Sequence, residues 1–320
     1  MKLAITGGYG YIGSQILENL SVEKNFEDWE IFVIDNGSYG RGTIPLEEIF
    51  KNKIKRFSTH ILDISVCDGE RFNELKSILS NVDYIINLAS LTQIPNTPLH
   101  KKYIYDGVIN ILNIVQSNDN IKKIVDISSA SVYGSLKHSY PEIKEPFDES
   151  IYASPDTALH QYSKFKLQTE KIWKQDKFKD LPYTSLRLST CFGYAIGLRH
   201  NLFINEFLFN TFLDKKTVIP GKADNYRPFV HVHDAANVII HLLENDFHTN
   251  GHILNVGSRE LNPRLGDLFE KIDNLITEEY SLKPKYGFAF EKDQNTIQES
   301  YILDYTKFNK MVDYKLKMVD

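Results

Sequence analysis

The first thirteen residues contain three glycines whose spacing constrains the fold of the chain. An apolar run stops at Gly7, two more glycines follow at Gly10 and Gly13, and a helical pattern begins near Tyr11. In a dinucleotide-binding turn the first glycine permits a tight turn, the second lets the backbone approach a pyrophosphate, and the third allows the helix to pack closely on the strand. The phosphates then lie at the helix N-terminus, where free N–H groups and the helix dipole favour an anion. The residues expected to form this site are Gly7, Gly10, Tyr11, Ile12 and Gly13.

A second apolar run, Ile31–Ile34, ends at Asp35, about twenty residues beyond the glycines. A carboxylate at this position hydrogen-bonds the adenosine ribose and repels a 2′-phosphate, so Asp35 predicts NAD rather than NADP. Two alternatives stay open. Asp35 and Asn36 precede a glycine, and such a sequence also forms ordinary turns at strand ends. NADP stays an alternative cofactor, because Arg41 can bind a 2′-phosphate.

Short apolar runs alternate with helical patterns through the first half of the chain, which is the βαβα rhythm of a doubly wound parallel sheet. The runs that predict strands are Leu3–Thr6, Ile31–Ile34, Phe57–Ile61, Tyr84–Leu88, Lys123–Ile127 and Thr184–Leu188. The patterns that predict helices cover residues 11–21, 69–80, 99–117 and 157–175. We therefore expect an α/β fold with a Rossmann-type NAD-binding domain over residues 1–189.

The rhythm breaks after Ser189. Helical patterns cover 201–214 and 262–276, short strands are predicted at Val230–Val232 and Ile253–Val256, and residues 278–300 are polar and irregular. We interpret 190–320 as mainly a smaller, discontinuous substrate-binding lobe, with strand and helix returns to the first domain near 229–258. Such a lobe would cover the carboxyl ends of the strands, where doubly wound sheets bind ligands.

Composition disfavours several other classes of protein. The chain of 320 residues can bury a substantial core, and its net charge of −5 offers no basic stripe for nucleic acid. No run of eighteen apolar residues could span a membrane. Because the first strand begins at Lys2, we expect no signal or transit sequence and a cytoplasmic protein. Cys67 and Cys191 lack the spacing of a disulfide framework or a zinc site, so no metal is expected.

Tyr162 and Lys166 lie four residues apart in a helical pattern, which places both on one helix face. A nearby ammonium favours the phenolate and lowers the tyrosine pKa from about 10 toward working pH, which suits general acid/base catalysis. The same spacing also arises by chance on solvated helix faces, because the chain holds 18 tyrosines. Within Asp126–Gly134 a predicted strand ends in hydroxyls, one of which can hydrogen-bond a substrate hydroxyl opposite the tyrosine.

Together these residues resemble the extended short-chain dehydrogenase/reductase superfamily, in its NAD-dependent nucleotide-sugar epimerase/dehydratase branch. The resemblance runs from Lys2 to about Lys307. The matching segments are the turn at 6–14, Asp35 and Asn36, Asp63 and Ile64, 87–90, 128–134, Tyr162 and Lys166, Glu170, Leu186 and Arg187, Phe192 and Gly193, 218–222, 227–234 and 255–258.

The resemblance implies NAD as cofactor and a nucleoside-diphosphate sugar as substrate, in a homodimer formed through the helices at 99–117 and 157–175. Beyond the glycine turn, the residues that it assigns to the cofactor are Asp35, Asn36, Asp63, Ile64, Leu88, Ala89, Ser90, Tyr162 and Lys166. Its catalytic residues are Ser129, Tyr162 and Lys166. Its substrate-binding candidates are Ser129, Ser131, Thr190, Asn205 and Arg227.

Two departures from the family pattern concern the substrate and the reaction. Thr190 stands where relatives carry an asparagine that contacts a substrate phosphate, and Asn205 on the following helix is the candidate replacement. The 4,6-dehydratases carry an Asp-Glu pair after the catalytic hydroxyl and use it to eliminate water. In this chain Ala130 and Ser131 follow Ser129 instead, which disfavours dehydration.

The resemblance therefore implies 4-epimerisation of a nucleotide sugar through a transient 4-keto intermediate. Tyr162, as a phenolate supported by Lys166, removes the proton of the 4-hydroxyl while Ser129 holds that oxygen. Hydride leaves carbon 4 for NAD and returns to the other face of the sugar. Arg227 anchors the diphosphate, and Arg199 is a second candidate anchor that can equally be a solvated loop charge. The alternatives are a 4-ketosugar reductase or dehydrogenase, a 4,6-dehydratase, and a non-catalytic NAD-binding protein.

Overall fold

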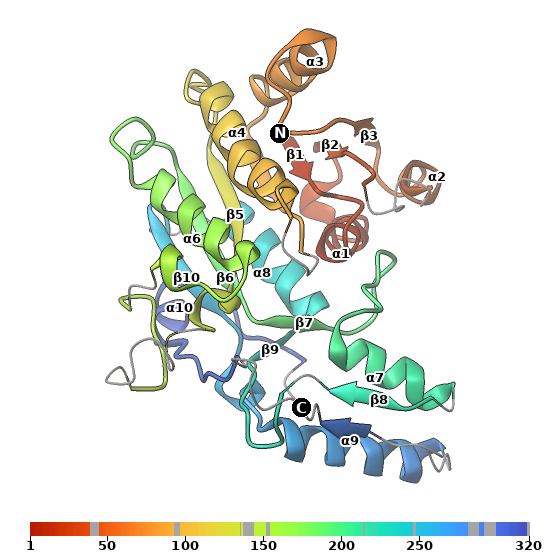
Figure 1. The fold of residues 1–320 in the computed structure, drawn as a ribbon. Coiled ribbons are helices and arrows are strands. Elements are labelled where there is room, and N and C mark those ends of the chain that lie inside the picture. Colours follow the sequence, from red (N-terminus) through yellow and green to blue (C-terminus); the bar gives the residue numbers. More distant parts are fainter. Residues whose placement is uncertain are drawn as a thin grey trace.

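A seven-stranded parallel sheet forms the centre of the protein (Figure 1). The computed structural model describes residues 1–38, 45–92, 97–134, 136, 144–151, 154–213, 215–219, 221–245, 248–280, 288–290 and 299–318. In order across the sheet, the strands are β10 (His252–Val256), β6 (Tyr183–Leu188), β5 (Lys123–Ser129), β4 (Tyr84–Asn87), β1 (Lys2–Thr6), β2 (Glu30–Asp35) and β3 (Arg56–Ile61). The predicted doubly wound fold is confirmed.

The chain enters the sheet at its centre and leaves in both directions. It runs from β1 outward to β2 and β3, then crosses back to β4 on the other side of β1. In the parallel register Thr6 pairs with Ile34 on one side and with Asn87 on the other. The order of the strands therefore reverses between β1 and β4, and a doubly wound sheet binds its ligand at such a reversal, beyond the carboxyl ends of the strands.

Helices cover both faces of this sheet. On one face α1 (Tyr11–Leu20), α2 (Leu46–Phe50) and α8 (Val232–Glu244) pack in one core cluster with β1 and β2. On the other face α3 (Gly69–Leu79), α4 (Gly107–Val115) and the end of α6 (Gln161–Trp173) form a second cluster. Strands buried on both faces read as continuous apolar runs, which explains why the sequence predicts them well.

A smaller layer lies beyond the carboxyl ends of the sheet strands (Figure 1). It contains α7 (Phe203–Phe212) and α9 (Leu265–Tyr280), which pack with the parallel pair β8 (Thr217–Ile219) and β11 (Phe288–Phe290). Its core is aromatic: the rings of Phe207 and Phe269 meet edge to face at 4.8 Å. A second parallel pair, β7 (Thr190–Phe192) and β9 (Phe229–His231), connects this layer to the sheet.

The structure corrects several sequence-based boundaries. The predicted strand Val230–Val232 is β9 (Phe229–His231), and the helix α8 begins at Val232 without an intervening loop. The predicted helix 99–117 consists of a π-helical turn at Lys101–Asp106 followed by α4. In the stretch 278–300, expected to be irregular, α9 continues to Tyr280 and β11 forms at Phe288–Phe290. The helices α2 and α10 (Thr306–Met311) were not expected.

No helix in the described part of the chain is long and apolar enough to cross a membrane.

Candidate active site

A cavity of about 740 Å³ lies where the sheet strands end. Every predicted cofactor residue lines it: Gly7, Gly10, Tyr11, Ile12, Gly13, Asp35, Asn36, Asp63, Ile64, Leu88, Ala89, Ser90, Tyr162 and Lys166. Of the predicted substrate residues, Ser129, Ser131, Thr190 and Arg227 also line it. The topology therefore brings together side chains that are far apart in the sequence.

The glycine turn has the close contacts that its sequence predicts. Gly7 has a φ of +73°, and a Cβ there would lie 2.7 Å from the backbone nitrogen of Ala89. A Cβ on Gly13 would lie 2.6 Å from the Cα of Gly8. Gly10 is the N-cap of α1, and no side chain caps this helix. The turn therefore presents open backbone N–H groups to the cavity, which fits a dinucleotide pyrophosphate.

Asp35 is held in place at the carboxyl end of β2. Its Oδ2 accepts a hydrogen bond of 3.1 Å from the backbone N–H of Tyr9, and its Oδ1 accepts one of 2.9 Å from Gly37. These bonds orient the carboxylate beside the glycine turn, as recognition of an adenosine ribose requires. Arg41, the alternative reader of a 2′-phosphate, lies outside the described residues.

Asp63 and Ser90 also line the cavity. Asp63 accepts hydrogen bonds from Ser65 and forms an ion pair of 2.9 Å with Lys102. Burial alone would raise the pKa of the Asp63 carboxyl, but these contacts hold it below its usual range. The Oγ of Ser90 is buried and has no hydrogen-bond partner among the described residues, which leaves it available to a bound group.

Ser129, Tyr162 and Lys166 meet at the carboxyl end of β5. Ser129 is the last residue of the strand, and its Oγ accepts a hydrogen bond of 3.2 Å from the N–H of Ser131. Tyr162 and Lys166 stand on the same face of α6, with the lysine Nζ 5.9 Å from the centre of the tyrosine ring. Lys166 also donates a hydrogen bond of 2.5 Å to the carbonyl of Ile127. A phenol with a cation beside it, in a cavity that a serine hydroxyl also lines, suits proton exchange with a substrate hydroxyl.

The environment of Lys166 is unusual for a lysine because the side chain is buried. Burial lowers the pKa of its ammonium, while the charges of Asp126 and Glu170 oppose that shift. Asp126 is itself buried and accepts a hydrogen bond of 2.6 Å from the side-chain amide of Asn87. Desolvation raises the pKa of Asp126. The lysine therefore belongs to a coupled set of buried ionisable groups.

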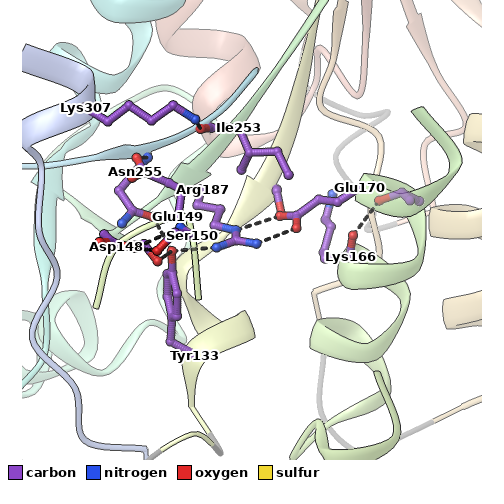
Figure 2. Close-up of polar contacts among 12 residues, drawn as sticks. Tyr133, Asp148, Glu149, Ser150, Lys166, Glu170, Arg187, Ile253, Asn255 and Lys307 are labelled. Atoms are coloured by element: carbon purple, nitrogen blue, oxygen red, sulfur yellow. Dashed lines mark hydrogen bonds and ion pairs between the residues drawn. The ribbon is translucent and has the colours of Figure 1, made fainter. Parts of the chain in front are cut away.

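A buried network behind α6 connects the candidate site to the C-terminal part of the chain (Figure 2). Arg187 on β6 forms a bidentate ion pair with Glu170, with N···O distances of 2.9 and 2.7 Å. Its other amino group donates to the hydroxyl of Tyr133, which in turn donates to Asn255 at 2.9 Å. Ser128 donates to the same carboxylate of Glu170 at 2.6 Å. Each charged atom of this buried pair has a partner, which is the condition for a stable buried ion pair.

The structure places Asn205 differently from the other predicted substrate residues. It is buried on α7, outside the lining of the cavity, and its side-chain amide donates a hydrogen bond of 3.0 Å to the carbonyl of Arg199. Asn205 therefore holds the loop that carries Arg199, and Arg199 lines the cavity. Spacing along a helix placed Asn205 near the site but could not show which way its amide points.

The lining residues that were not predicted from the sequence include His160, Glu299 and Tyr301. Glu299 forms an ion pair with Arg227 and also lies 3.7 Å from Nε2 of His160. Burial alone would lower the pKa of Arg227, but the Glu299 carboxylate raises it above its ordinary value. Glu299 is in a polar stretch without periodicity, and such a stretch carries no sequence signal for a buried carboxylate.

Residues 3–257 match the model of the NAD dependent epimerase/dehydratase family. The chain belongs to this family. Its cofactor is NAD, and the glycine turn, Asp35 and the unpartnered Ser90 hydroxyl fit that molecule. Members of the family are enzymes, and the intact Ser129, Tyr162 and Lys166 agree with an enzyme here.

Known relatives are distant and differ in their reactions. The chain is 26% identical over 264 residues to the UDP-N-acetyl-alpha-D-glucosaminuronate decarboxylase of Bacillus cytotoxicus, covering 81% of this chain and 75% of the relative. It is 27% identical over 282 residues to the UDP-glucose 4-epimerase of Lactobacillus helveticus, covering 81% and 77%. Its fold resembles that of the UDP-glucuronic acid 4-epimerase from Bacillus cereus in complex with UDP-glucuronic acid and NAD, with a TM-score of 0.79, 18% identity, and coverage of 99% and 95%.

Proposed function

We propose that this protein is an NAD-dependent 4-epimerase of a nucleoside-diphosphate sugar. The observation that carries the proposal is the meeting of Ser129, Tyr162 and Lys166 with the glycine turn in one cavity, where the residues after Ser129 are Ala130 and Ser131. Elimination of water needs an acid and a base at that place, and neither residue supplies one. The UDP-sugar 4-epimerases among the relatives support the same reaction.

In the proposed mechanism Tyr162 exchanges the proton of the sugar 4-hydroxyl. The ammonium of Lys166 stabilises the phenolate, and Ser129 donates a hydrogen bond that holds the sugar oxygen in place. NAD held by the glycine turn and Asp35 would supply the hydride chemistry at carbon 4. The cavity would let the 4-keto sugar rotate and present its other face, and Tyr162 would return its proton to the 4-oxygen as the epimer forms.

We assign the remaining residues to binding. The cofactor lies along the glycine turn, Asp35, Asn36, the pair Asp63 and Ile64, and the strand end at residues 88–90, all of which line the cavity. Ser131 and Thr190 face the substrate, and Arg227 and Arg199 supply N–H donors for its diphosphate. Asn205 lies outside the cavity lining and acts through the residues that it holds: its amide donates to the carbonyl of Arg199, and its side chain hydrogen-bonds Tyr11.

The predicted division of the chain and its assembly belong to the same proposal. Residues 1–189, with α8 and β10, carry the cofactor, and the remainder of 190–320 carries most of the substrate contacts. We further propose a cytoplasmic homodimer formed through α4 and α6, which light scattering of the purified protein would test.

The decisive experiment incubates the purified protein with UDP-, GDP-, dTDP- and CDP-sugars and follows the products by NMR. We expect new anomeric signals from one nucleotide series, with no net NADH absorbance and no solvent deuterium at carbon 5. Stoichiometric formation or consumption of NADH would instead show a reductase or dehydrogenase. Loss of water with deuterium at carbon 5 would show a dehydratase.

A further inference from the structure

Arg227 and Glu299 form an ion pair in the lining of the cavity. Both side chains are largely buried, with 17% and 10% of their surfaces exposed. Glu299 packs against Gly134, where an added Cβ would lie 2.8 Å from the Glu299 Cγ. Its other carboxylate oxygen faces His160, two residues before Tyr162. Glu299 is therefore between the segments that carry Ser129 and Tyr162.

The surroundings hold both partners of this pair in place. The guanidinium carbon of Arg227 lies 6.0 Å from the ring centre of Phe203 and 5.8 Å from that of Tyr301. Gly134 and His160 restrain Glu299 on its other side. Because neither side chain can leave easily, the carboxylate stays in the cavity lining, and Arg227 keeps its other N–H groups for a ligand.

The pair leaves little positive charge for a further anion. Arg227 is neutralised by Glu299, and Lys166 is buried and bonded to the carbonyl of Ile127. Arg199, the other arginine among the described lining residues, lies close to Tyr11 at the nucleotide turn. An acidic group on the sugar would meet the Glu299 carboxylate in a cavity from which bound substrate excludes water, and such like charges repel strongly.

We propose that Glu299 determines substrate specificity by excluding sugars that carry a carboxylate, so that the enzyme acts on hexoses or N-acetylhexosamines with an uncharged carbon 6. The proposal rests on the proposed function, because it assumes that a nucleotide sugar occupies this cavity. It goes beyond that function in naming the sugar class and the residue that selects it.

The test compares three ligands, UDP, UDP-glucose and UDP-glucuronate, by calorimetry on the NAD-loaded Tyr162→Phe protein, which binds without turnover. We expect UDP-glucuronate to bind at least about tenfold more weakly than UDP-glucose. Adding Glu299→Gln, which keeps the size of the side chain, should reduce the ratio of the UDP-glucuronate dissociation constant to the UDP-glucose dissociation constant about tenfold or more. If the substitution weakens the binding of all three ligands equally, this ratio of dissociation constants does not change.

Two further variants separate charge from shape. Glu299→Asp keeps the negative charge and should keep most of the discrimination. Asp224→Asn removes a carboxylate that pairs with Arg264 at 2.5 Å outside the cavity, and it should leave the ratio unchanged.

Three results would overturn the inference. One is that the parent protein binds UDP-glucuronate as tightly as UDP-glucose. This measurement does not depend on whether a Glu299 variant folds. Another is a ratio of the UDP-glucuronate and UDP-glucose dissociation constants in Glu299→Gln that stays within threefold of the parent's ratio. The last is a Glu299→Asp protein that loses as much discrimination as Glu299→Gln. If UDP and UDP-glucose bind while the ratio fails to move, only this inference falls. If no UDP ligand binds either protein, UDP-sugars are excluded as substrates and this inference falls as well.

Discussion

At the scale of single residues, Tyr162 bears most of the proposed chemistry. Its ring lies beside the Lys166 ammonium and lines the same cavity as the glycine turn. Tyr162→Phe removes only the hydroxyl, so we expect unchanged NAD content and a loss of about a hundredfold or more in kcat, the scale of positioned proton transfer. Tyr194→Phe, at a tyrosine 75% exposed, is the matched control. Near-normal turnover by the Tyr162 variant would show that another group is the base.

Asp35 is the residue that should select the cofactor. Its carboxylate is oriented by two backbone N–H groups at the end of β2, where it would meet the extra phosphate of NADP. We expect NAD to bind at least about tenfold more tightly than NADP, which corresponds to about 1.4 kcal/mol, and Asp35→Asn to reduce that preference. Calorimetry with both cofactors measures the two dissociation constants, with the exposed Asp28→Asn as control. Equal affinities for NAD and NADP in the parent protein would contradict this assignment and would indicate that Arg41 binds the 2′-phosphate.

At the scale of elements, the Glu170–Arg187 pair joins α6 to β6. Both side chains are only 4% exposed, so removal of one charge leaves the other buried without compensation. We expect Glu170→Gln to lower the free energy of unfolding by about 3–5 kcal/mol. Asp224→Asn, which breaks an exposed pair with Arg264, should cost about 1 kcal/mol or less. Denaturant unfolding measures both, and equal losses would show that the buried pair contributes no more than a surface pair.

His231 gives α8 a cap that depends on pH. Its Nδ1 accepts a hydrogen bond of 3.2 Å from the N–H of His233, which a proton on that nitrogen would prevent. Burial lowers the pKa of His231, with Asp234 opposing the shift and His233 reinforcing it. The unfolded chain therefore binds the proton first. The contribution of neutral His231 is complete above about pH 6.5 and is lost as pH falls through the lowered folded value.

His231→Asn keeps a capping side chain and removes the titration. We expect the free energy of unfolding of this variant to fall less than that of the parent between about pH 7.5 and about pH 5. His248→Asn, at an exposed histidine, should leave the parent's pH dependence unchanged. Parallel pH profiles for the parent and the His231 variant would rule out the proposed role of this cap.

The same elements show what sequence reasoning could reach. The strands β1, β2, β4 and β5 were predicted because their burial makes them nearly continuous apolar runs, whereas β3 is only partly buried. A helix was expected only as a return near 229–258, and its start could not be located because α8 follows β9 directly, with no glycine or proline between them and a histidine as its N-cap. Ser129, Tyr162 and Lys166 could be named because their motifs are local. Glu299 could not, because its pairing with Arg227 spans 72 residues of chain.

At the scale of the whole molecule, the chain interleaves its two parts. The strand β10 completes the sheet beside β6, and α8 packs against α1, although both come from the second half of the sequence. A fragment of residues 1–189 would expose the edge of β6 and the apolar face of α1. We expect this fragment to lack a cooperative thermal transition and dispersed NMR signals, whereas the full chain melts in a single transition. A well-folded fragment would show that residues 1–189 are an independent domain.

The late position of α8 and β10 also has a consequence for how the protein is made. Synthesis proceeds from the N-terminus, so strands β1 to β6 leave the ribosome before the segments that cover α1 and pair with β6. During that interval the nascent chain presents an unpaired strand edge and an uncovered apolar helix, both of which favour association with other chains. Slow translation through residues 189–232 would prolong this exposure. A holding chaperone would bind the unpaired edge of β6 or the uncovered face of α1.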